Sequence, residues 1–558
     1  MKSNIRLNMI LIFCGFLGLV STIIAFFDIQ FKYQHIILFL HLLSFLLFIL
    51  SLFIFIRTSP PQKLLKKHKI IFLGIMLLSI ITRFIFLNFY PFVSFGDEVR
   101  DGGHDAYEIY QKKTANIFTY GSYNSHGLII PTFASFFYPL FENSNLLYRF
   151  PSALISVVDI ALIFFVSYWN FGITPAVISS LAIISLPLHL FYSRTQMVVI
   201  FSSFLTTFFL LLFTFYKNPK KPHLFLLIGY LCGFSFNFHA SIRPISLIII
   251  LFVIVSEIKN IHRLLLFLFF IIVGFGPRLI FTPLNIFFHT TRLTASVSGS
   301  LTNKIWELIG RYITSLLVLV IEPTQSFFKD NRPILNMFYA ALFFVGIIFL
   351  LKRLKKRIFQ IILILVFAIP LTNSAITDGL NFDHRLAPLL PLGAILIGCG
   401  FFYLYSTIKF NIIKYIFLGS FISVFLLEII VFFVDKKANH NWENHYFVRD
   451  YLSMHLIYFL QKKQDLLNKS ICVAVSPNNI DYFTDPIQIE EKYGFFLPDT
   501  QIEFKRDELT GDNEAMVSNS CYSPSKENYL SYQYSCPDNF FKCPDNFVGN
   551  ILIYSETP

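Results

Sequence analysis

Apolar stretches of membrane-spanning length recur along most of the chain and alternate with short polar loops as far as Val434. A helix needs about 17–25 apolar residues to cross a bilayer core. The pattern predicts thirteen spans, at residues 8–27, 36–56, 70–91, 151–168, 174–191, 197–215, 223–239, 243–257, 264–283, 334–351, 358–375, 386–405 and 414–434. We therefore expect an all-α polytopic membrane protein. More spans follow the first stretch at once, so it is expected to be an anchor and not a cleaved signal.

Basic residues concentrate in loops at every second crossing. The loops read "MKSNIR", "RTSPPQKLLKKHK", "YKNPKKPH", "EIKNIHR", "KRLKKR" and "KFNIIK". Loops on the cytoplasmic side are enriched in lysine and arginine. We therefore expect a cytoplasmic amino terminus and an extracytoplasmic tail. The same bias accounts for the formal net charge of +12, so nucleic acid is not an expected partner.

Three outer segments are long enough to carry function: 92–150, 284–333 and the tail 435–558. The first contains "DEVRDGGHDAYEIYQKK" and "GLIIPTFASFFYPLF", which predict helices lying in the membrane interface. In the second, "NKIWELIGRYITSLLVLVIEP" is interpreted as an interfacial helix, because a fourteenth span would invert the "KRLKKR" loop.

The chain then divides into three parts. Residues 1–69 form two amino-terminal spans and a basic loop, residues 70–434 form the core with its outer loops, and residues 435–558 form a small soluble domain. We expect this domain to be mixed α/β.

Composition supports a membrane protein. The chain of 558 residues is 55% hydrophobic and 14% charged and contains 70 Phe, whereas soluble proteins carry about 25% charged residues. Four of the seven cysteines lie in the polar tail: Cys472, Cys521, Cys536 and Cys543. An even number of cysteines outside the cytoplasm predicts at least one disulfide among them, although sequence does not give the pairing.

A dense group of charges, "SFGDEVRDGGHDAYEIYQ" at residues 94–111, follows directly on an apolar stretch. Gly96 permits a tight turn out of the membrane. Asp97 and Glu98 then stand at the start of a predicted helix, where the helix dipole favours carboxylates. Each charge alone could simply be solvated. Adjacent acids at a membrane boundary could also hold a general base beside a lipid-borne substrate.

Arginines gather on the same predicted outer side, which the positive-inside bias disfavours. They are Arg83, Arg149, Arg194, Arg243, Arg278, Arg292 and Arg385. One arginine alone could snorkel to the interface. Together they indicate an anionic ligand, and the guanidinium fork suits phosphate.

Five segments between about residues 70 and 405 occur in an order and on a membrane side that resemble a known family. They are "FGDEVRDGG", "LLYRFPSALISVV", "LHLFYSRTQM", "GFSFNFHASIRPISLI" and "HRLAPLLPLGAILIGCG". They resemble the bacterial dolichyl-phosphate-mannose protein mannosyltransferase-like family of the C-type glycosyltransferase superfamily. The resemblance implies a glycosyltransferase that takes a hexosyl or pentosyl group from a polyprenyl phosphate, not from a nucleotide sugar.

The resemblance also implies site residues. Asp97 would be the catalytic base with Glu98 beside it, and Arg385 would meet the donor phosphate, helped by Arg243 and Arg292. Substrate contacts are expected from His104, Asn124, His126 and Arg194. Many family members have a basic residue and paired prolines where this chain has "YNSHGLIIP".

No cofactor or metal is expected. His104 and Asp105 could bind a divalent cation, but no convincing set of metal ligands accompanies them. The expected partners are the lipid-phosphate sugar donor, membrane lipids and an acceptor that sequence leaves open as a lipid, glycan or protein.

Two other functions remain as alternatives. A transporter or lipid flippase would place polar residues inside several spans and break helices near the midplane. Asp159 lies inside a predicted span and is either functional or a packed helix contact. An assembly factor would use the tail to bind partners and the spans as an anchor, but the outer arginines argue against it.

Overall fold

The computed structural model describes most of the bundle and parts of the tail. The described residues are 2–28, 32–58, 63–88, 91, 98–112, 118, 127–195, 199–216, 222–281, 301–323, 332–376, 383–434, 453–454, 456–457, 460–461, 470–475, 493–497, 501–506, 514–518, 529–534 and 549–554.

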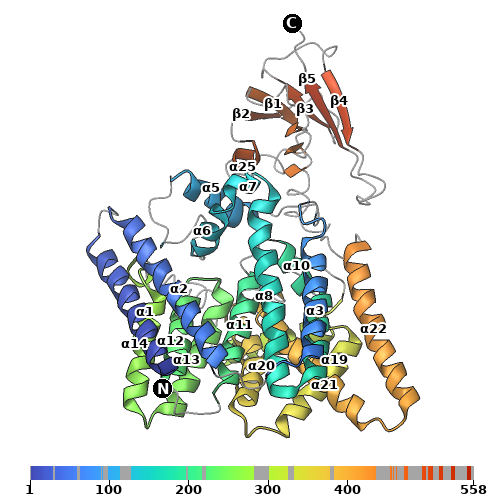
Figure 1. Ribbon diagram of the computed structural model, residues 1–558. Coiled ribbons are helices and arrows are strands. Elements are labelled where there is room, and N and C mark those ends of the chain that lie inside the picture. Colours follow the sequence, from blue (N-terminus) through green and yellow to red (C-terminus); the bar gives the residue numbers. More distant parts are fainter. Residues whose placement is uncertain are drawn as a thin grey trace.

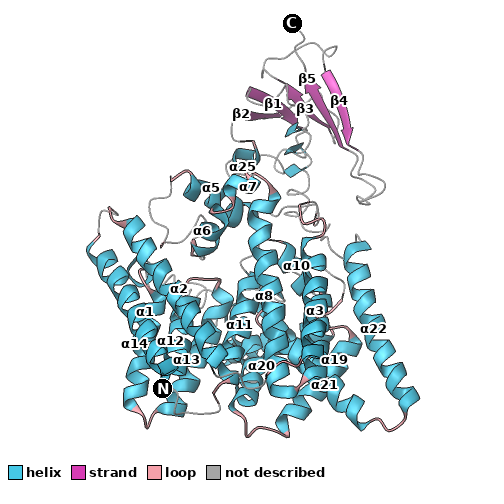
Figure 2. Cartoon of the chain, viewed as in Figure 1, coloured by secondary structure: helices cyan, strands magenta, loops and turns pink. Residues whose placement is uncertain are grey.

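Long helices make up the body of the protein (Figures 1 and 2). They are α1 (Lys2–Phe27), α2 (Gln34–Thr58), α3 (Lys66–Phe84), α8 (Asn145–Phe171), α9 (Ile173–Ser185), α10 (Pro187–Arg194), α11 (Val199–Thr214), α12 (Pro222–Ser235), α13 (Arg243–Glu257), α14 (Ile261–Phe275), α18 (Leu301–Val320), α19 (Met337–Leu351), α20 (Arg357–Ile376), α21 (Leu389–Thr407) and α22 (Asn411–Val434). Each predicted span overlaps one of these helices or, for 174–191, the pair α9 and α10, although α3 and α14 end several residues before the predicted spans 70–91 and 264–283 do. The prediction of an all-α polytopic membrane protein is confirmed.

Helix length varies more than the apolar pattern suggests. Among the described helices, five are long and apolar enough to cross a membrane alone, and a sixth crossing results if α9 and α10 count as one span. That pair bends by 63°, because the break falls at Leu186 and Pro187, and proline cannot continue the backbone hydrogen bonding of a helix. The stretch that was expected to lie in the interface forms α18, a helix of 20 residues.

Glycines lie where helices pack closely. A Cβ on Gly233 of α12 would stand 1.9 Å from the carbonyl oxygen of Ile271 on α14, and one on Gly400 of α21 would stand 1.9 Å from that of Leu342 on α19. Membrane helices pack through such small residues because lipid tails supply no hydrophobic drive for association.

Short helices lie at one end of the bundle. In the first outer loop these are η1 (Val99–His104), a π-helix, followed by α5 (Asp105–Tyr110), α6 (Ile129–Ser135) and α7 (Tyr138–Phe141). Three more, η2 (Ala240–Ile242), α15 (Arg278–Phe281) and η3 (Asp383–Leu386), precede or follow bundle helices. Figure 1 places α5, α6, α7 and the tail at the end of the bundle that faces away from the amino terminus. The first loop and the tail therefore share one side, as predicted. Which side is cytoplasmic stays a prediction.

The tail contains a mixed five-stranded sheet in the order β2-β1-β3-β5-β4. Its strands are β1 (Ser470–Val475), β2 (Gln501–Arg506), β3 (Glu514–Ser518), β4 (Tyr529–Tyr534) and β5 (Gly549–Tyr554). Strand β1 pairs parallel with β2 and antiparallel with β3. The short helix α25 (Gly494–Phe496) lies between β1 and β2 in sequence. Of the tail cysteines, only Cys472 falls on a described strand, so the disulfide stays a prediction.

Candidate active site

Of the acidic pair predicted to carry the chemistry, the structure describes only Glu98. Asp97 lies outside the described residues, but its neighbour Glu98 directly precedes η1 and is fully buried. Arg149, in the first turns of α8, donates from Nε to Glu98 Oε1 over 2.8 Å and from Nη2 to Oε2 over 3.4 Å. Arg149 is also fully buried. The Glu98 carboxylate is therefore held in a two-pronged ion pair inside the protein.

Three further charged residues of this cluster, Arg100, Asp101 and Asp105, are buried as well, whereas Glu108 is half-buried. Arg100 pairs with Asp101, from Nε to Oδ1, over 2.7 Å. Gly103 lies close beneath the tail, since a Cβ there would stand 3.1 Å from the Tyr148 ring and 3.2 Å from the Phe495 ring. His104 is half-buried, and its Nδ1 has no hydrogen-bond partner among the described residues. Residues 98–105 of the first outer loop are therefore packed against the rest of the protein.

A group of arginines predicted to bind phosphate converges elsewhere at the same end. Arg243 begins α13 and Arg278 begins α15, and both are buried. Arg278 Nη1 donates to the carbonyl oxygen of Asn237 over 3.0 Å, and Arg243 Nη2 donates to that of Phe238 over 3.3 Å. The two guanidinium groups therefore bind adjacent carbonyls and lie close enough for their charges to repel.

Arg385 belongs to the short helix η3, which packs against η2. The rings of His239, just before η2, and His384, next to Arg385, meet edge to face with centroids 5.9 Å apart. The structure thus brings together the elements that carry Arg243 and Arg385, which are more than a hundred residues apart in sequence. Arg292, the third predicted phosphate ligand, lies outside the described residues.

The first outer loop reaches the arginine group through Gly127. A Cβ on this residue would stand 1.8 Å from Arg278 Nη1 and 2.5 Å from the Asn237 carbonyl oxygen, so only glycine fits. The predicted substrate contacts Asn124 and His126 lie just before it and outside the described residues. Sequence analysis placed Arg278 among the outer arginines but not in the site.

Arg194 occupies a different position from the other predicted ligands. It ends α10 and is fully buried. Its Nη1 donates to the carbonyl oxygens of Thr82 and Arg83, and its Nη2 to that of Ile85, at 2.6–3.1 Å. These hydrogen bonds tie Arg194 to the carboxyl end of α3.

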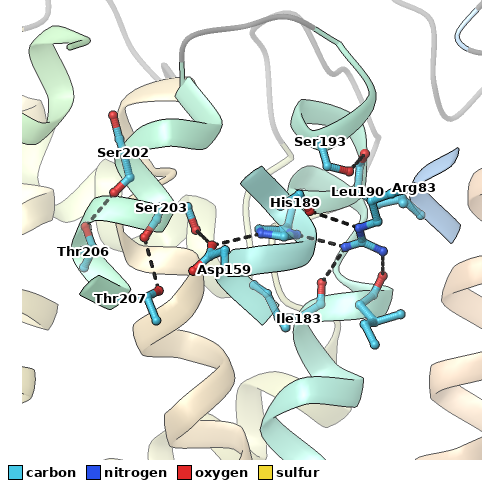
Figure 3. A network of polar contacts seen from close by, with 12 residues as sticks. Arg83, Asp159, Ile183, His189, Leu190, Ser193, Ser202, Ser203, Thr206 and Thr207 are labelled. Carbon is cyan, nitrogen blue, oxygen red and sulfur yellow. Dashed lines mark hydrogen bonds and ion pairs between the residues drawn. The ribbon is translucent and has the colours of Figure 1, made fainter. Parts of the chain in front are cut away.

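A fully buried line of polar side chains links α3, α10, α8 and α11 (Figure 3). Arg83 Nη2 lies 3.0 Å from His189 Nδ1, and His189 Nε2 lies 3.3 Å from Asp159 Oδ2. A guanidinium only donates hydrogen bonds, so Nδ1 accepts and Nε2 carries the proton. Ser203 Oγ donates to the same Asp159 oxygen over 2.7 Å. The imidazole of His189 therefore lies between the side chains of Arg83 and Asp159. Asp159 forms a buried contact between packed helices.

His189 was not among the residues predicted from the sequence to form the site. The only local signal was its place in "PLHLFYSR", directly after the helix break. Among the described residues, no three His, Cys, Asp or Glu side chains gather as a metal site would require.

Comparisons with known proteins support the resemblance read from the sequence. Residues 125–281 match the family model described as dolichyl-phosphate-mannose-protein mannosyltransferase. No curated protein matches the chain.

Among solved structures, ArnT from Cupriavidus metallidurans bound to undecaprenyl phosphate is 15% identical with a TM-score of 0.46, over 70% of this chain and 72% of that one. The Archaeoglobus fulgidus oligosaccharyltransferase in complex with Zn and sulfate is 14% identical with a TM-score of 0.44, over 65% and 53% of the two chains.

Proposed function

We propose that this chain is a membrane glycosyltransferase that uses a polyprenyl-phosphate sugar donor. The premise is that residues 125–281 match the family model described as dolichyl-phosphate-mannose-protein mannosyltransferase. The transferred group is a hexose or a pentose, and the acceptor is a lipid, a glycan or a protein. The reaction takes place at the outer face of a bacterial inner membrane, because the basic loops assign that side to the first outer loop.

The convergence of two buried arginines with a third that is half-buried is the observation that carries this proposal. Arg243 and Arg278 bind adjacent carbonyl oxygens, and Arg385 lies on the neighbouring η3. Like charges that are brought together away from water repel each other strongly. A phosphate between them would relieve this repulsion and accept charge-assisted hydrogen bonds from their guanidinium groups. The donor phosphate is therefore assigned to this group.

The chemical step needs a base and a stabilised leaving group. Asp97 accepts the proton of the acceptor hydroxyl or amine while the acceptor oxygen or nitrogen attacks the anomeric carbon. The bond from that carbon to the phosphate oxygen breaks, and its electron pair leaves with the polyprenyl phosphate. The arginines stabilise the negative charge that develops there. A single displacement inverts the anomeric configuration.

Within the acidic pair, the two residues take different roles. Both carboxylate oxygens of Glu98 are engaged by the buried Arg149, so Glu98 holds the loop in place. Asp97 remains the proposed base. In the sequence it directly precedes Glu98 and follows the third predicted span, so we assign the base to the membrane edge, where the lipid phosphate of the donor must lie.

Mass spectrometry of glycolipids and glycoproteins from cells with and without this protein tests the proposal. We expect a hexose or pentose adduct that disappears when the protein is absent and is not restored by the Asp97→Asn variant. Identical glycan profiles in the two strains, together with no transfer by the purified protein from any polyprenyl-phosphate sugar, would rule the proposal out.

Two observations favour a lipid flippase as the second candidate. The helix pair α9 and α10 is broken, and a charged network lies inside the bundle; transporters share both features. Against it, Arg83 and Asp159 are bridged by His189 and neither side chain is exposed. Proteoliposomes decide between the two: a flippase equilibrates a labelled lipid across the bilayer without changing it, whereas a transferase converts it.

A further inference from the structure

We infer that His239 is a further ligand of the donor phosphate, to which its neutral imidazole donates a hydrogen bond from Nε2. This inference rests on the proposed function, because it adds a residue to the proposed phosphate site. It gives that site a donor of a different kind, one that carries no charge beside the guanidinium groups.

The turn between α12 and η2 carries both His239 and the backbone acceptors of two arginines. The carbonyl oxygen of Asn237 accepts from Arg278, and that of Phe238 accepts from Arg243. His239 is the next residue along the chain and is only 7% exposed. Its side chain therefore begins directly beside the two carbonyl groups that hold these arginines.

The ring of His239 also reaches the element that carries the third arginine. It meets the ring of His384 edge to face, with the two centroids 5.9 Å apart. Arg385 directly follows His384 on η3, and η3 packs against η2. The imidazole of His239 therefore lies where the elements of all three proposed phosphate ligands meet.

The backbone determines which nitrogen of His239 carries the proton. The amide nitrogen of Ser241 donates to Nδ1 over 3.2 Å. A backbone N–H can only donate, and a proton on Nδ1 would bring two hydrogens into contact, so Nδ1 is the acceptor. A neutral imidazole accepts at one nitrogen and donates at the other. Nε2 therefore carries the proton, and the ring is held in its neutral form.

The turn that sets this orientation is anchored to the bundle. Ser241 Oγ lies 2.8 Å from His239 Nδ1 and donates to Ser202 Oγ of α11 over 2.8 Å. Ser202 is fully buried, and the next residue, Ser203, donates to Asp159 in the polar line of Figure 3. The direction of the Nε2–H group is therefore fixed before a substrate binds, which is the condition for effective electrostatic stabilisation.

The proposed reaction benefits from a donor without charge. In the sugar donor the phosphate is a diester with one negative charge. When its bond to the anomeric carbon breaks, it becomes a monoester with a charge of about −1.5 to −2 at pH 7. An N–H group stabilises the growing charge and, being neutral, adds nothing to the repulsion among the arginines. The proton stays on Nε2 throughout.

Three substitutions at His239 separate the hydrogen-bond donor from the shape of the ring. His239→Phe removes the donor and keeps an aromatic ring against His384. His239→Gln loses the ring but carries an amide N–H group about as far from the backbone as Nε2. His239→Asn carries the same amide one methylene group closer to the backbone, near the place of Nδ1. A donor at Nε2 predicts that only the glutamine variant functions, whereas a packing role predicts that the phenylalanine variant does.

The matched control is His68→Phe on α3. His68 is also buried, its Nδ1 lies 3.1 Å from the hydroxyl of Tyr168, and its ring also meets an aromatic ring edge to face. It lies outside the proposed site. The control therefore measures the effect of losing a buried imidazole alone.

Equilibrium binding of farnesyl phosphate, a short polyprenyl monophosphate, is measured on purified protein in phosphatidylcholine nanodiscs. Farnesol, which lacks the phosphate, is the reference ligand. His239→Phe and His239→Asn should raise the Kd for farnesyl phosphate by about ten- to a hundredfold, the range for a hydrogen bond to a charged group, and His239→Gln by less than about fivefold. Farnesol binding should be equal in all variants, and the control should match wild type with both ligands.

Each contrary outcome is distinct. Unchanged binding of farnesyl phosphate by His239→Phe would overturn the inference. Equal losses for His239→Gln and His239→Phe would show that the ring and not the donor is required. Equal weakening of farnesol and farnesyl phosphate would show that His239 shapes the lipid site without contacting phosphate, and wild-type protein that binds both ligands equally would leave no phosphate site to complete.

The two amide variants keep the test decisive if His239→Phe fails to fold, because they differ by one methylene group and both lack the ring. Transfer from the lipid-phosphate sugar, measured as kcat/KM, should follow the same order as binding. If wild-type protein binds farnesyl phosphate but transfers no sugar, the proposed function fails, while the binding series still decides whether His239 contacts the phosphate.

Discussion

Arg149 and Glu98 form a buried ion pair, with Nε of the arginine 2.8 Å from Oε1 of the glutamate and no exposure of either side chain. Fifty-one residues separate them in sequence. Charges are buried at a large cost in desolvation, which only close pairing and further hydrogen bonds offset. Arg149 meets this condition by also binding two carbonyl oxygens. The pair is therefore part of the fold of the first outer loop.

Glu98→Gln is expected to lower stability. Removing one partner of a buried pair leaves the other charge uncompensated, which typically costs about 3–5 kcal/mol. Thermal unfolding in detergent, followed by a size-exclusion or dye readout, measures this loss. The control is Glu307→Gln, because Glu307 pairs with Arg311 but is 43% exposed. Equal melting temperatures for the two variants would show that the Glu98 pair contributes no more than a surface pair.

Asp97→Asn is expected to abolish transfer without loss of stability. The amide keeps the shape of the side chain but cannot accept a proton, and loss of a general base costs about a hundredfold or more. Initial rates and melting temperature are measured on the same preparation. A variant that retains near-full transfer would remove Asp97 as the base, and the catalytic carboxylate would then have to be sought elsewhere in the loop.

Arg385→Lys is expected to weaken use of the donor. A lysine is a point donor and cannot reproduce the two-pronged contact with phosphate. We expect a loss of about ten- to a hundredfold in kcat/KM for the lipid-phosphate sugar, equivalent to about 1.5–3 kcal/mol for a charged hydrogen bond. Arg311→Lys, on α18, serves as the control. Unchanged kcat/KM in the Arg385 variant would take this residue out of the site.

Gly103→Ala is expected to disturb the contact between the first outer loop and the tail. The new methyl group would press on the rings of Tyr148 and Phe495, at 3.1 and 3.2 Å. Crowding of a packed contact costs about 1–3 kcal/mol. We expect limited proteolysis to release the tail more readily and transfer to fall. The matched control is Gly74→Ala on α3, where a Cβ meets nothing within 4 Å.

Two outcomes would contradict the prediction for Gly103→Ala. Proteolysis and transfer that both match the Gly74 control would show that the contact between Phe495 and the loop does not hold the tail. Faster release of the tail with full transfer would show that the tail is held there but is not needed for catalysis.

The helices could be predicted well from the sequence because a membrane span is encoded by a run of consecutive apolar residues. A run such as residues 414–434 is apolar over a bilayer thickness, and the structure forms α22 there. The helix break at Pro187 was not predicted, because the apolar run continues through it. The group formed by Arg243, Arg278 and Arg385 was only partly predicted. Sequence placed all three on one side, but their adjacency comes from contacts such as that between His239 and His384.

By itself, the sequence determined that the chain lies in a membrane, where its helices run, and that a cluster of charges stands at the edge of one span. Hydrophobic length and the placement of basic loops fix these features, and both can be read along the chain. Only the tertiary structure decided what the charges do. Burial and pairing depend on which distant residues meet, so Glu98 became the partner of Arg149, Asp159 that of His189, and Arg194 the cap of α3.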